Sequence, residues 1–199
     1  MRIAITGTSS GVGKCLSEIL AEKGHTVIEI TRDEYDLDYP WHINRLGFVD
    51  ILINCAGHDL GGKVPFHEHT FVYWRNIMNT NLLSPMRLCQ LAIRANPIVT
   101  IVNITSTNND KFWPGDLAYS LSKKSLEEFG NMLFEEHPDI TVKEVRLGLT
   151  KTNFNANRHK VNHKPIDDLY SNKHLLPEDV AAKICEFIFS NETFIRIAP

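Results

Sequence analysis

The chain has 199 residues, of which 43% are hydrophobic and 23% are charged, and its formal net charge is −3. This composition is typical of a single soluble domain, and the weakly acidic balance with dispersed Lys and Arg does not favour a nucleic-acid partner. The longest apolar runs, such as residues 98–102, are far shorter than the ~20 residues of a membrane-spanning helix, so we expect no membrane segment.

Short runs rich in β-branched residues alternate with longer helical patterns along the chain. This alternation is typical of a mostly parallel sheet with helices on both faces, so it predicts one doubly wound α/β domain of the Rossmann type over residues 1–199. The expected strands are 2–6, 26–31, 50–54, 98–104, 141–147 and 193–197. The expected helices are 12–23, 67–95 with a break near Asn81, 117–136 and 177–190.

A glycine-rich loop follows the first expected strand and leads into an amphipathic helix. Glycine lets backbone amides approach phosphate groups, and the amino end of a helix supplies unpaired N–H groups and a favourable dipole. A nucleoside-triphosphate loop would need a glycine at position 8 and a Ser or Thr at position 15, where this chain has Thr8 and Cys15. The loop therefore predicts a pyrophosphate site, with a plain strand-to-helix turn as the alternative. Its residues are Gly7, Thr8, Ser9, Ser10, Gly11, Val12 and Gly13.

Tyr119 and Lys123 lie four residues apart at the start of an expected helix, so both side chains leave the same helix face. A tyrosine phenol ionises near pH ~10, but a nearby ammonium group stabilises the phenolate and lowers that pKa. Tyr119 can then exchange a proton near neutral pH. Ser106 follows an apolar strand, where an open α/β sheet presents functional residues, and its hydroxyl can polarise a substrate oxygen. A solvated helix face and a strand-end cap are the alternative interpretations.

These motifs, in this order, resemble the short-chain dehydrogenase/reductase family in its compact single-domain branch, from Arg2 to about Thr152. Residues 6–13 are similar to the TGxxxGxG loop of the family, 54–57 to its NNAG turn, and 81–85 to the helix segment that holds its catalytic asparagine. Residues 101–106 and 119–123 match two further motifs of the family. Residues 146–152 are similar to the PGxxxT segment, with Leu147 in place of the proline.

The resemblance implies an NAD(P)(H)-dependent oxidoreductase that transfers a hydride between nicotinamide and a small carbonyl or alcohol substrate. Tyr119 would be the general acid in reduction and the base in oxidation. Lys123 would lower the pKa of Tyr119 and hold the nicotinamide ribose, Ser106 would steady the reacting oxygen, and Asn81 would complete a proton relay through Lys123. Beyond the glycine loop, the implied cofactor contacts are Asn54, Ala56, Gly57, Tyr119, Lys123, Gly148 and Thr152.

The end of the second expected strand lacks the acidic residue that would accept both ribose hydroxyls of NAD. Arg32 stands there instead and can pair with a 2′-phosphate, which favours NADP(H) over NAD(H), although Asp33 and Glu34 could neutralise it. Only four residues separate this strand from Asp36, too few for a parallel crossover. We therefore expect a trimmed sheet edge, a short helix at 41–46, and a contact from Asp36 to adenine.

The resemblance also implies a homodimer or homotetramer in which the helices after Pro65 and from Leu117 pair across a two-fold axis. Burial in the core of one protomer explains the expected seam residues about as well. Those residues are Leu82, Met86, Leu88 and Phe129.

Substrate specificity is expected from loops 58–69 and 153–176, because both follow strands beside the cofactor crevice and the chain ends soon after the last strand. The second loop hints at an anionic substrate group, with a solvated polar loop as the alternative, through Arg158, His159, Lys160, His163 and Lys164. His67 and His69 do not predict a metal site, because neighbours two apart do not share a helix face.

Two other functions are possible alternatives. The short link after the second expected strand is also similar to that of sugar-nucleotide reductases, but the glycine spacing and the second domain of that branch are missing. A cofactor-sensing regulator is the other alternative, but such a protein would not need the intact catalytic residues. No room for a signal peptide precedes the apolar run at Arg2, so we expect a cytoplasmic protein.

Reduced thiols are expected for the four dispersed cysteines, Cys15, Cys55, Cys89 and Cys185.

Overall fold

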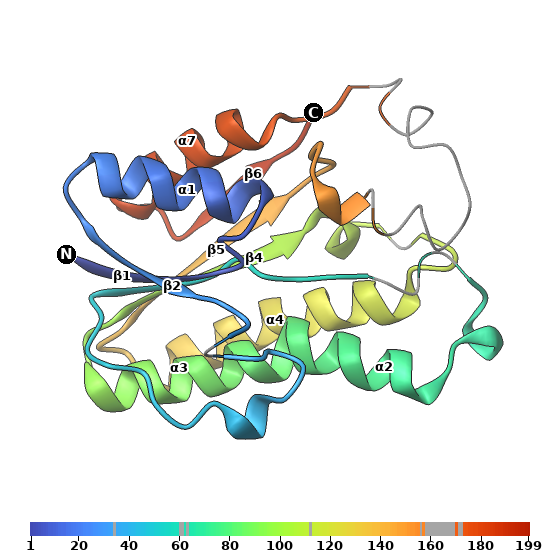
Figure 1. Ribbon diagram of the computed structural model, residues 1–199, viewed down its shortest axis with the longest axis horizontal. Helices are drawn as coiled ribbons and strands as arrows, with labels where there is room; N and C mark the ends of the chain where they lie inside the picture. Colours follow the sequence, from blue (N-terminus) through green and yellow to red (C-terminus); the bar gives the residue numbers. More distant parts are fainter. Residues whose placement is uncertain are drawn as a thin grey trace.

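A six-stranded parallel sheet forms the centre of the molecule, in the order β2-β1-β3-β4-β5-β6 (Figure 1). The computed structural model describes residues 1–33, 35–59, 62, 64–111, 113–155, 157, 170 and 173–199. The order runs outward from β1 in both directions, which creates a switch point between β1 and β3. The doubly wound α/β prediction is confirmed. The strands are β1 Arg2–Thr6, β2 Thr26–Ile30, β3 Ile51–Asn54, β4 Thr100–Ser106, β5 Thr141–Leu147 and β6 Phe194–Ile197.

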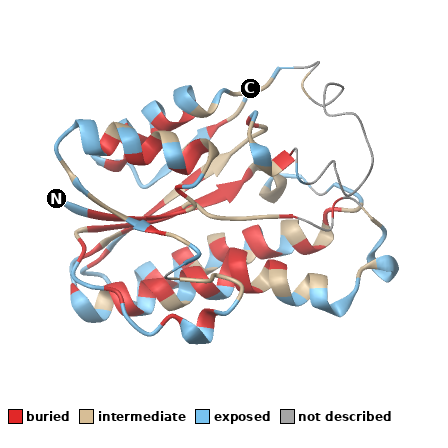
Figure 2. Cartoon of the chain, viewed as in Figure 1, coloured by how far each residue is buried: buried red, intermediate tan, exposed pale blue. Residues whose placement is uncertain are grey.

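Helices cover both faces of this sheet. Helices α1 (Gly11–Glu22) and α7 (Pro177–Ile188) lie on one face, and α2 (Phe71–Met78), α3 (Ser84–Ala95) and α4 (Leu117–Glu136) lie on the other (Figure 1). Figure 2 shows burial concentrated on the strands and on the helix sides that face them. A strand covered on both faces needs apolar residues at successive positions, and β3 is buried along its whole length.

The expected long helix at 67–95 is divided into α2, a π-helical segment Asn79–Leu83, and α3. The π segment replaces the expected break near Asn81 with wider turns, so α2 and α3 remain joined. Segments of this kind are frequent at functional sites. Here it buries three consecutive polar residues, Asn79, Thr80 and Asn81.

The link between β2 and β3 contains no strand in its described residues, as the trimmed-edge prediction required. The expected helix at 41–46 is wrong, because only a 3₁₀ turn forms, over Pro40–His42. The carbonyl of Ile43 accepts a hydrogen bond from Arg87 Nε at 2.7 Å, and that of Val49 accepts one from Asn96 Nδ2 at 2.9 Å. Side chains of α3 and its C-cap thus hold the link extended.

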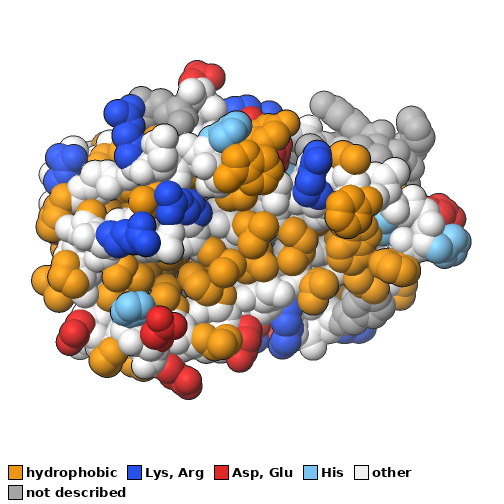
Figure 3. Space-filling view, turned by 90° about the horizontal axis from the view of Figure 1, so that it is seen from below, with side chains coloured by type: hydrophobic (Ala, Val, Ile, Leu, Met, Phe, Trp, Pro, Cys, Tyr) orange, Lys and Arg blue, Asp and Glu red, His pale blue; other side chains and the backbone are white. Residues whose placement is uncertain are grey.

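The outer side of the α2–α4 layer carries hydrophobic side chains on the face shown in Figure 3. Four apolar residues of the π segment, α3 and α4 are 37% to 61% exposed, and we call this set the outer apolar face: Leu83, Met86, Leu121 and Met132. Of the two interpretations of the seam residues, burial within the protomer holds for Leu82 and Leu88. Phe129 is partly buried against the same core.

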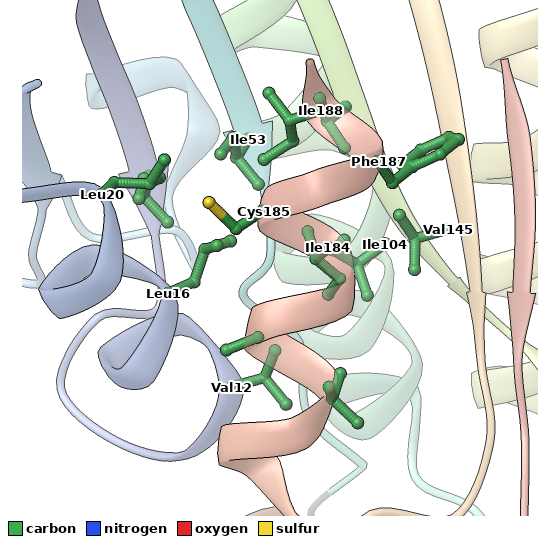
Figure 4. Close-up of a cluster of buried hydrophobic side chains, with 14 of the residues drawn as sticks. Val12, Leu16, Leu20, Ile53, Ile104, Val145, Ile184, Cys185, Phe187 and Ile188 are labelled. Carbon is green, nitrogen blue, oxygen red and sulfur yellow. The ribbon is translucent and has the colours of Figure 1, made fainter. Parts of the chain in front are cut away.

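The core on the α1 and α7 side places both helices against the sheet. Buried residues recur every four positions along α1, which aligns them on one face, and α7 presents a matching apolar face. Figure 4 shows these side chains converging on the strands: Val12, Leu16 and Leu20 from α1, Ile184, Cys185, Phe187 and Ile188 from α7, and Ile53, Ile104 and Val145 from the sheet. This packing fixes the position of α1, and therefore of the loop before it.

The four cysteines are free thiols, as expected. Among the described residues, no helix combines the length and the apolar character needed to cross a membrane.

Candidate active site

The residues singled out in the sequence gather where β1, β3, β4 and β5 end, at one edge of the sheet. Because the strands are parallel, their carboxyl ends share that edge, and the turns that follow them come together. The glycine loop follows β1, residues 54–57 end β3 and begin its turn, Ser106 ends β4, and Thr152 follows β5.

Close backbone approach makes glycine necessary in the loop after β1. Gly7 has φ +77°, and a Cβ built on it would lie 2.9 Å from Ala56 Cα. A Cβ on Gly13 would lie 2.3 Å from the Gly7 carbonyl oxygen. Gly11 has φ +58° and faces Thr152, whose Cγ2 would lie 3.0 Å from an added Cβ. The loop is therefore packed between the turns that follow β3 and β5.

The start of α1 suits a phosphate group. Ser10 is its N-cap in an extended conformation, and within the described residues its side chain makes no capping hydrogen bond. Thr8 is 5% exposed, and its Oγ1 is buried without a hydrogen-bond partner among those residues. Uncapped N–H groups, an unsatisfied hydroxyl and a backbone cradle fit the pyrophosphate of a dinucleotide.

Lys123 is buried beneath the turn that follows β3. Its Nζ donates to the Ile104 carbonyl at 2.9 Å, and a Cβ on Gly57 would lie 3.1 Å from Nζ and 3.3 Å from Asn81 Oδ1. Burial lowers the pKa of Lys123 to about 8, and burial raises the pKa of the nearby Cys55 to about 11. At neutral pH the lysine is mostly protonated and the cysteine is a neutral thiol.

The Asn81 amide fixes the same turn. Its Nδ2 donates to the His58 carbonyl and to Ser122 Oγ, and its Oδ1 accepts from the His58 N–H, all at 3.0 Å. The side chains of Asn81 and Lys123 therefore both lie against Gly57, but each makes its hydrogen bonds to other residues. A proton relay between them remains a prediction.

Ser106 stands at the end of β4, and Tyr119 lies in the first turn of α4. Ser106 is buried, and its Oγ accepts from the Asn108 N–H at 3.1 Å, so it does cap the following turn. A hydroxyl that accepts through one lone pair can still donate its proton to another group. The Tyr119 ring is partly buried, with its centroid 5.4 Å from that of Phe154.

Asn54 and Gly148 have structural partners. Asn54 Nδ2 donates to Asn103 Oδ1 at 2.9 Å and lies 3.5 Å from Cys89 Sγ, so this side chain is engaged in the core under the sheet. A Cβ on Gly148 would lie 3.1 Å from Ala198 Cα, so the chain after β6 packs tightly against this glycine. Any contact of Asn54 with a cofactor would come from its backbone.

The link after β2 contains a partner that the sequence did not indicate. Arg32 Nη2 lies 3.5 Å from Asp38 Oδ2, whereas the sequence pointed to Asp33 and Glu34 as the neutralising acids; Glu34 lies outside the described residues. Asp36 Oδ1 accepts from the Asp38 N–H at 3.0 Å, which stabilises the turn there. The further acids in the six residues after Arg32 were the available signal for this pairing.

The two expected specificity loops are described only in part. Residues 60, 61 and 63 of the first, and 156, 158–169, 171 and 172 of the second, lie outside the described residues. The second set includes all the candidate anion-binding residues, Arg158, His159, Lys160, His163 and Lys164.

Replacement of Gly13 by alanine is expected to lower the free energy of unfolding by about 1–3 kcal/mol, because the new methyl group would collide with the Gly7 carbonyl. Urea denaturation measures this change. Gly47→Ala is the matched control, since a Cβ at Gly47 meets nothing within 4 Å. Equal stability of the two variants would contradict the packed-loop geometry.

Comparison with known proteins agrees with this arrangement. The family model described as short chain dehydrogenase matches residues 39–163. A 3-ketodihydrosphingosine reductase of Bacteroides thetaiotaomicron is 30% identical over 181 residues, covering 79% of this chain and 66% of that protein. An acetoacetyl-CoA reductase of Cupriavidus necator is 31% identical over 156 residues, covering 75% and 62%. The chain thus spans just under two thirds of the length of these two relatives.

Solved structures show the same fold. The closed form of a serine dehydrogenase complexed with NADP+ has a TM-score of 0.86 and 22% identity, and the match covers 99% of this chain and 94% of that one. A short-chain dehydrogenase from Streptomyces avermitilis has a TM-score of 0.80 and 24% identity, with 100% and 87% covered. With a family model matching more than half of its residues, the chain belongs to the short-chain dehydrogenase family of oxidoreductases.

Proposed function

We propose that this protein is an NADP(H)-preferring oxidoreductase that transfers a hydride between nicotinamide and a small carbonyl or alcohol substrate, with Tyr119 exchanging the proton. The main support is the juxtaposition of buried Lys123, Gly57 and Asn81 beside a glycine cradle at one sheet edge. The reductase names of the two curated relatives agree with a carbonyl substrate.

Several groups of the chain would hold the cofactor. Backbone amides of residues 7–13 would bind the pyrophosphate, with Thr8 Oγ1 finding its missing partner there. Arg32 would pair with the 2′-phosphate, Asp36 would contact adenine, and Lys123 would hold the nicotinamide ribose. The remaining contacts proposed are Asn54 through its backbone, Ala56, Gly57, Tyr119, Gly148 and Thr152. When bound, nicotinamide supplies or accepts the hydride.

Proton transfer falls to Tyr119. In reduction, the phenol donates its proton to the substrate oxygen as that oxygen gains negative charge, and the reverse transfer occurs in oxidation. The Lys123 ammonium stabilises the resulting phenolate, and Ser106 donates a hydrogen bond to the reacting oxygen. Asn81 would complete a proton relay through Lys123, and its amide also bonds to the His58 backbone and to Ser122 Oγ.

Replacement of Tyr119 by phenylalanine is expected to reduce kcat for carbonyl reduction by about 10²- to 10⁴-fold, because it removes the proton donor and leaves the ring. NADPH oxidation with a panel of small ketones and 3-oxoacyl thioesters measures the rate, and nucleotide fluorescence measures binding. NADPH binding should stay within about threefold of wild type. Tyr39→Phe is the control, on an exposed side chain of the link.

Failure of the wild type to bind either NADPH or NADH would refute the proposed function. Binding with undiminished turnover in Tyr119→Phe would refute only the role of Tyr119.

The pH profile tests the role of Lys123. Its lowered pKa makes the ammonium form dominant below about pH 8, and this charged form is the one that stabilises a phenolate. We therefore expect kcat/KM for reduction to fall above about pH 8. Lys123→Met should lose activity at all pH values, whereas Lys124→Met, on an exposed neighbour, should keep the wild-type profile. A flat wild-type profile from neutral pH to about pH 10 would contradict this assignment.

Association of two copies is part of the proposal. On α4, Leu121 and Met132 are eleven residues apart and share one helix face, and the π segment and α3 add Leu83 and Met86. An exposed apolar face of this kind is typical of a protein–protein contact. Pairing across a two-fold axis would cover it in both copies.

Met132→Lys is expected to shift the protein towards the monomer, because it places a charge in the outer apolar face. Phe134→Lys is the matched control on the same helix. Phe134 is also exposed, but it lies outside the outer apolar face and lines a surface pocket together with Thr141 and Val142. Sedimentation velocity gives the mass of each. A wild-type protein that is monomeric at micromolar concentration would rule out pairing through the outer apolar face.

A further inference from the structure

We propose that Asp38 sets the preference between NADP(H) and NAD(H), because its carboxylate is a fixed negative charge that competes with the 2′-phosphate for Arg32. This inference rests on the proposed function and deepens it. It assigns a selectivity role to the shortened link, at a position that the sequence motifs left without one.

The structure holds Asp38 from three directions. Thr80 Oγ1 donates to Asp38 Oδ1, and Asn79 Nδ2 donates to the Asp38 carbonyl at 2.7 Å. The Asp38 N–H donates to Asp36 Oδ1 at 3.0 Å. Both the side chain and the backbone of Asp38 are thus anchored, two of the bonds coming from the buried π segment.

Arg32 is the more exposed partner of the pair. Its side chain is 75% exposed, whereas that of Asp38 is 25% exposed. An exposed ion pair at 3.5 Å contributes little to stability, so a phosphate can draw Arg32 away at small cost. The carboxylate stays in place, well within a Debye length (~8 Å) of the guanidinium position. A 2′-phosphate bound there meets both the attraction of Arg32 and the repulsion of Asp38.

The neighbouring histidine does not cancel this charge at neutral pH. His58 Nε2 lies 3.6 Å from Asp38 Oδ1, but burial lowers the pKa of His58, which favours its neutral form. Arg32 is therefore the main positive charge facing Asp38 among the described residues. The two opposed charges predict a moderate rather than an absolute preference for NADP(H).

Replacement of Asp38 by asparagine tests the charge while keeping an oxygen that can accept from Thr80. We expect the Kd for NADPH to fall about threefold to tenfold, with the Kd for NADH changing less than about twofold. Asp33→Asn removes the same charge from an exposed residue next to Arg32 and should change the ratio of the two Kd values less. Nucleotide fluorescence gives each Kd, and a melting curve shows whether each variant is folded.

Arg32→Gln keeps the experiment decisive even if Asp38→Asn fails to fold, because the Arg32 side chain is largely exposed. With Asp38 unopposed, this variant should bind NADH more tightly than NADPH. Equal binding of the two nucleotides by Arg32→Gln would overturn the inference, as would equal changes in both Kd values in folded Asp38→Asn. Those results would leave the proposed function standing, whereas a wild type that binds neither nucleotide would end both.

Discussion

Close contact between the turns that follow β1 and β3 is the constraint on which the site depends. Thr6 Oγ1 accepts the N–H groups of Cys55 and Ala56, both at 2.9 Å, and an added Cβ at Gly7 would come within 2.9 Å of Ala56 Cα. Two adjacent strands of the switch point are thus joined by hydrogen bonds and by backbone contact. The turn after β3 can then hold Gly57 against Lys123, so the proposed phosphate cradle and the buried ammonium group have a fixed separation.

The π segment is the second element that unites the site. Asn79 and Thr80 bind the link after β2 through Asp38, and Asn81 binds the turn after β3 through His58. A regular helix turns about 100° per residue, so three consecutive side chains would point in widely separated directions. The wider π turns change these directions, and all three polar side chains are buried towards neighbouring segments. One short π segment thus contacts the segments at both ends of the proposed cofactor site.

Local pattern was enough to predict the strands and the glycine loop. All six strands lie within two residues of their expected bounds, because apolar runs and turn residues mark a buried parallel strand. The glycine loop was recognisable because its backbone geometry excludes other residues. For Leu88 the sequence left both a seam and the core open, because periodicity alone does not say whether an apolar helix side meets the sheet or a second copy; the structure places it in the core. The acids that follow Arg32 in the chain indicate an acidic partner, but which of them it meets depends on how the π segment and α3 anchor the link.

The shortened link between β2 and β3 explains why the Asp38 carboxylate lies close to Arg32, at the end of β2. A crossover helix after β2 would carry the chain about a dozen or more residues away before it returned to the sheet. Here no such helix follows β2, and side chains of α3 hold the link in its place. Ser84 Oγ donates to the Leu37 carbonyl and Arg87 Nε donates to the Ile43 carbonyl, each at 2.7 Å. Because these bonds fix the backbone on both sides of Asp38, its carboxylate is held beside Arg32. Trimming the sheet edge thus places an acid near the proposed phosphate site without an acidic residue at the end of β2 itself.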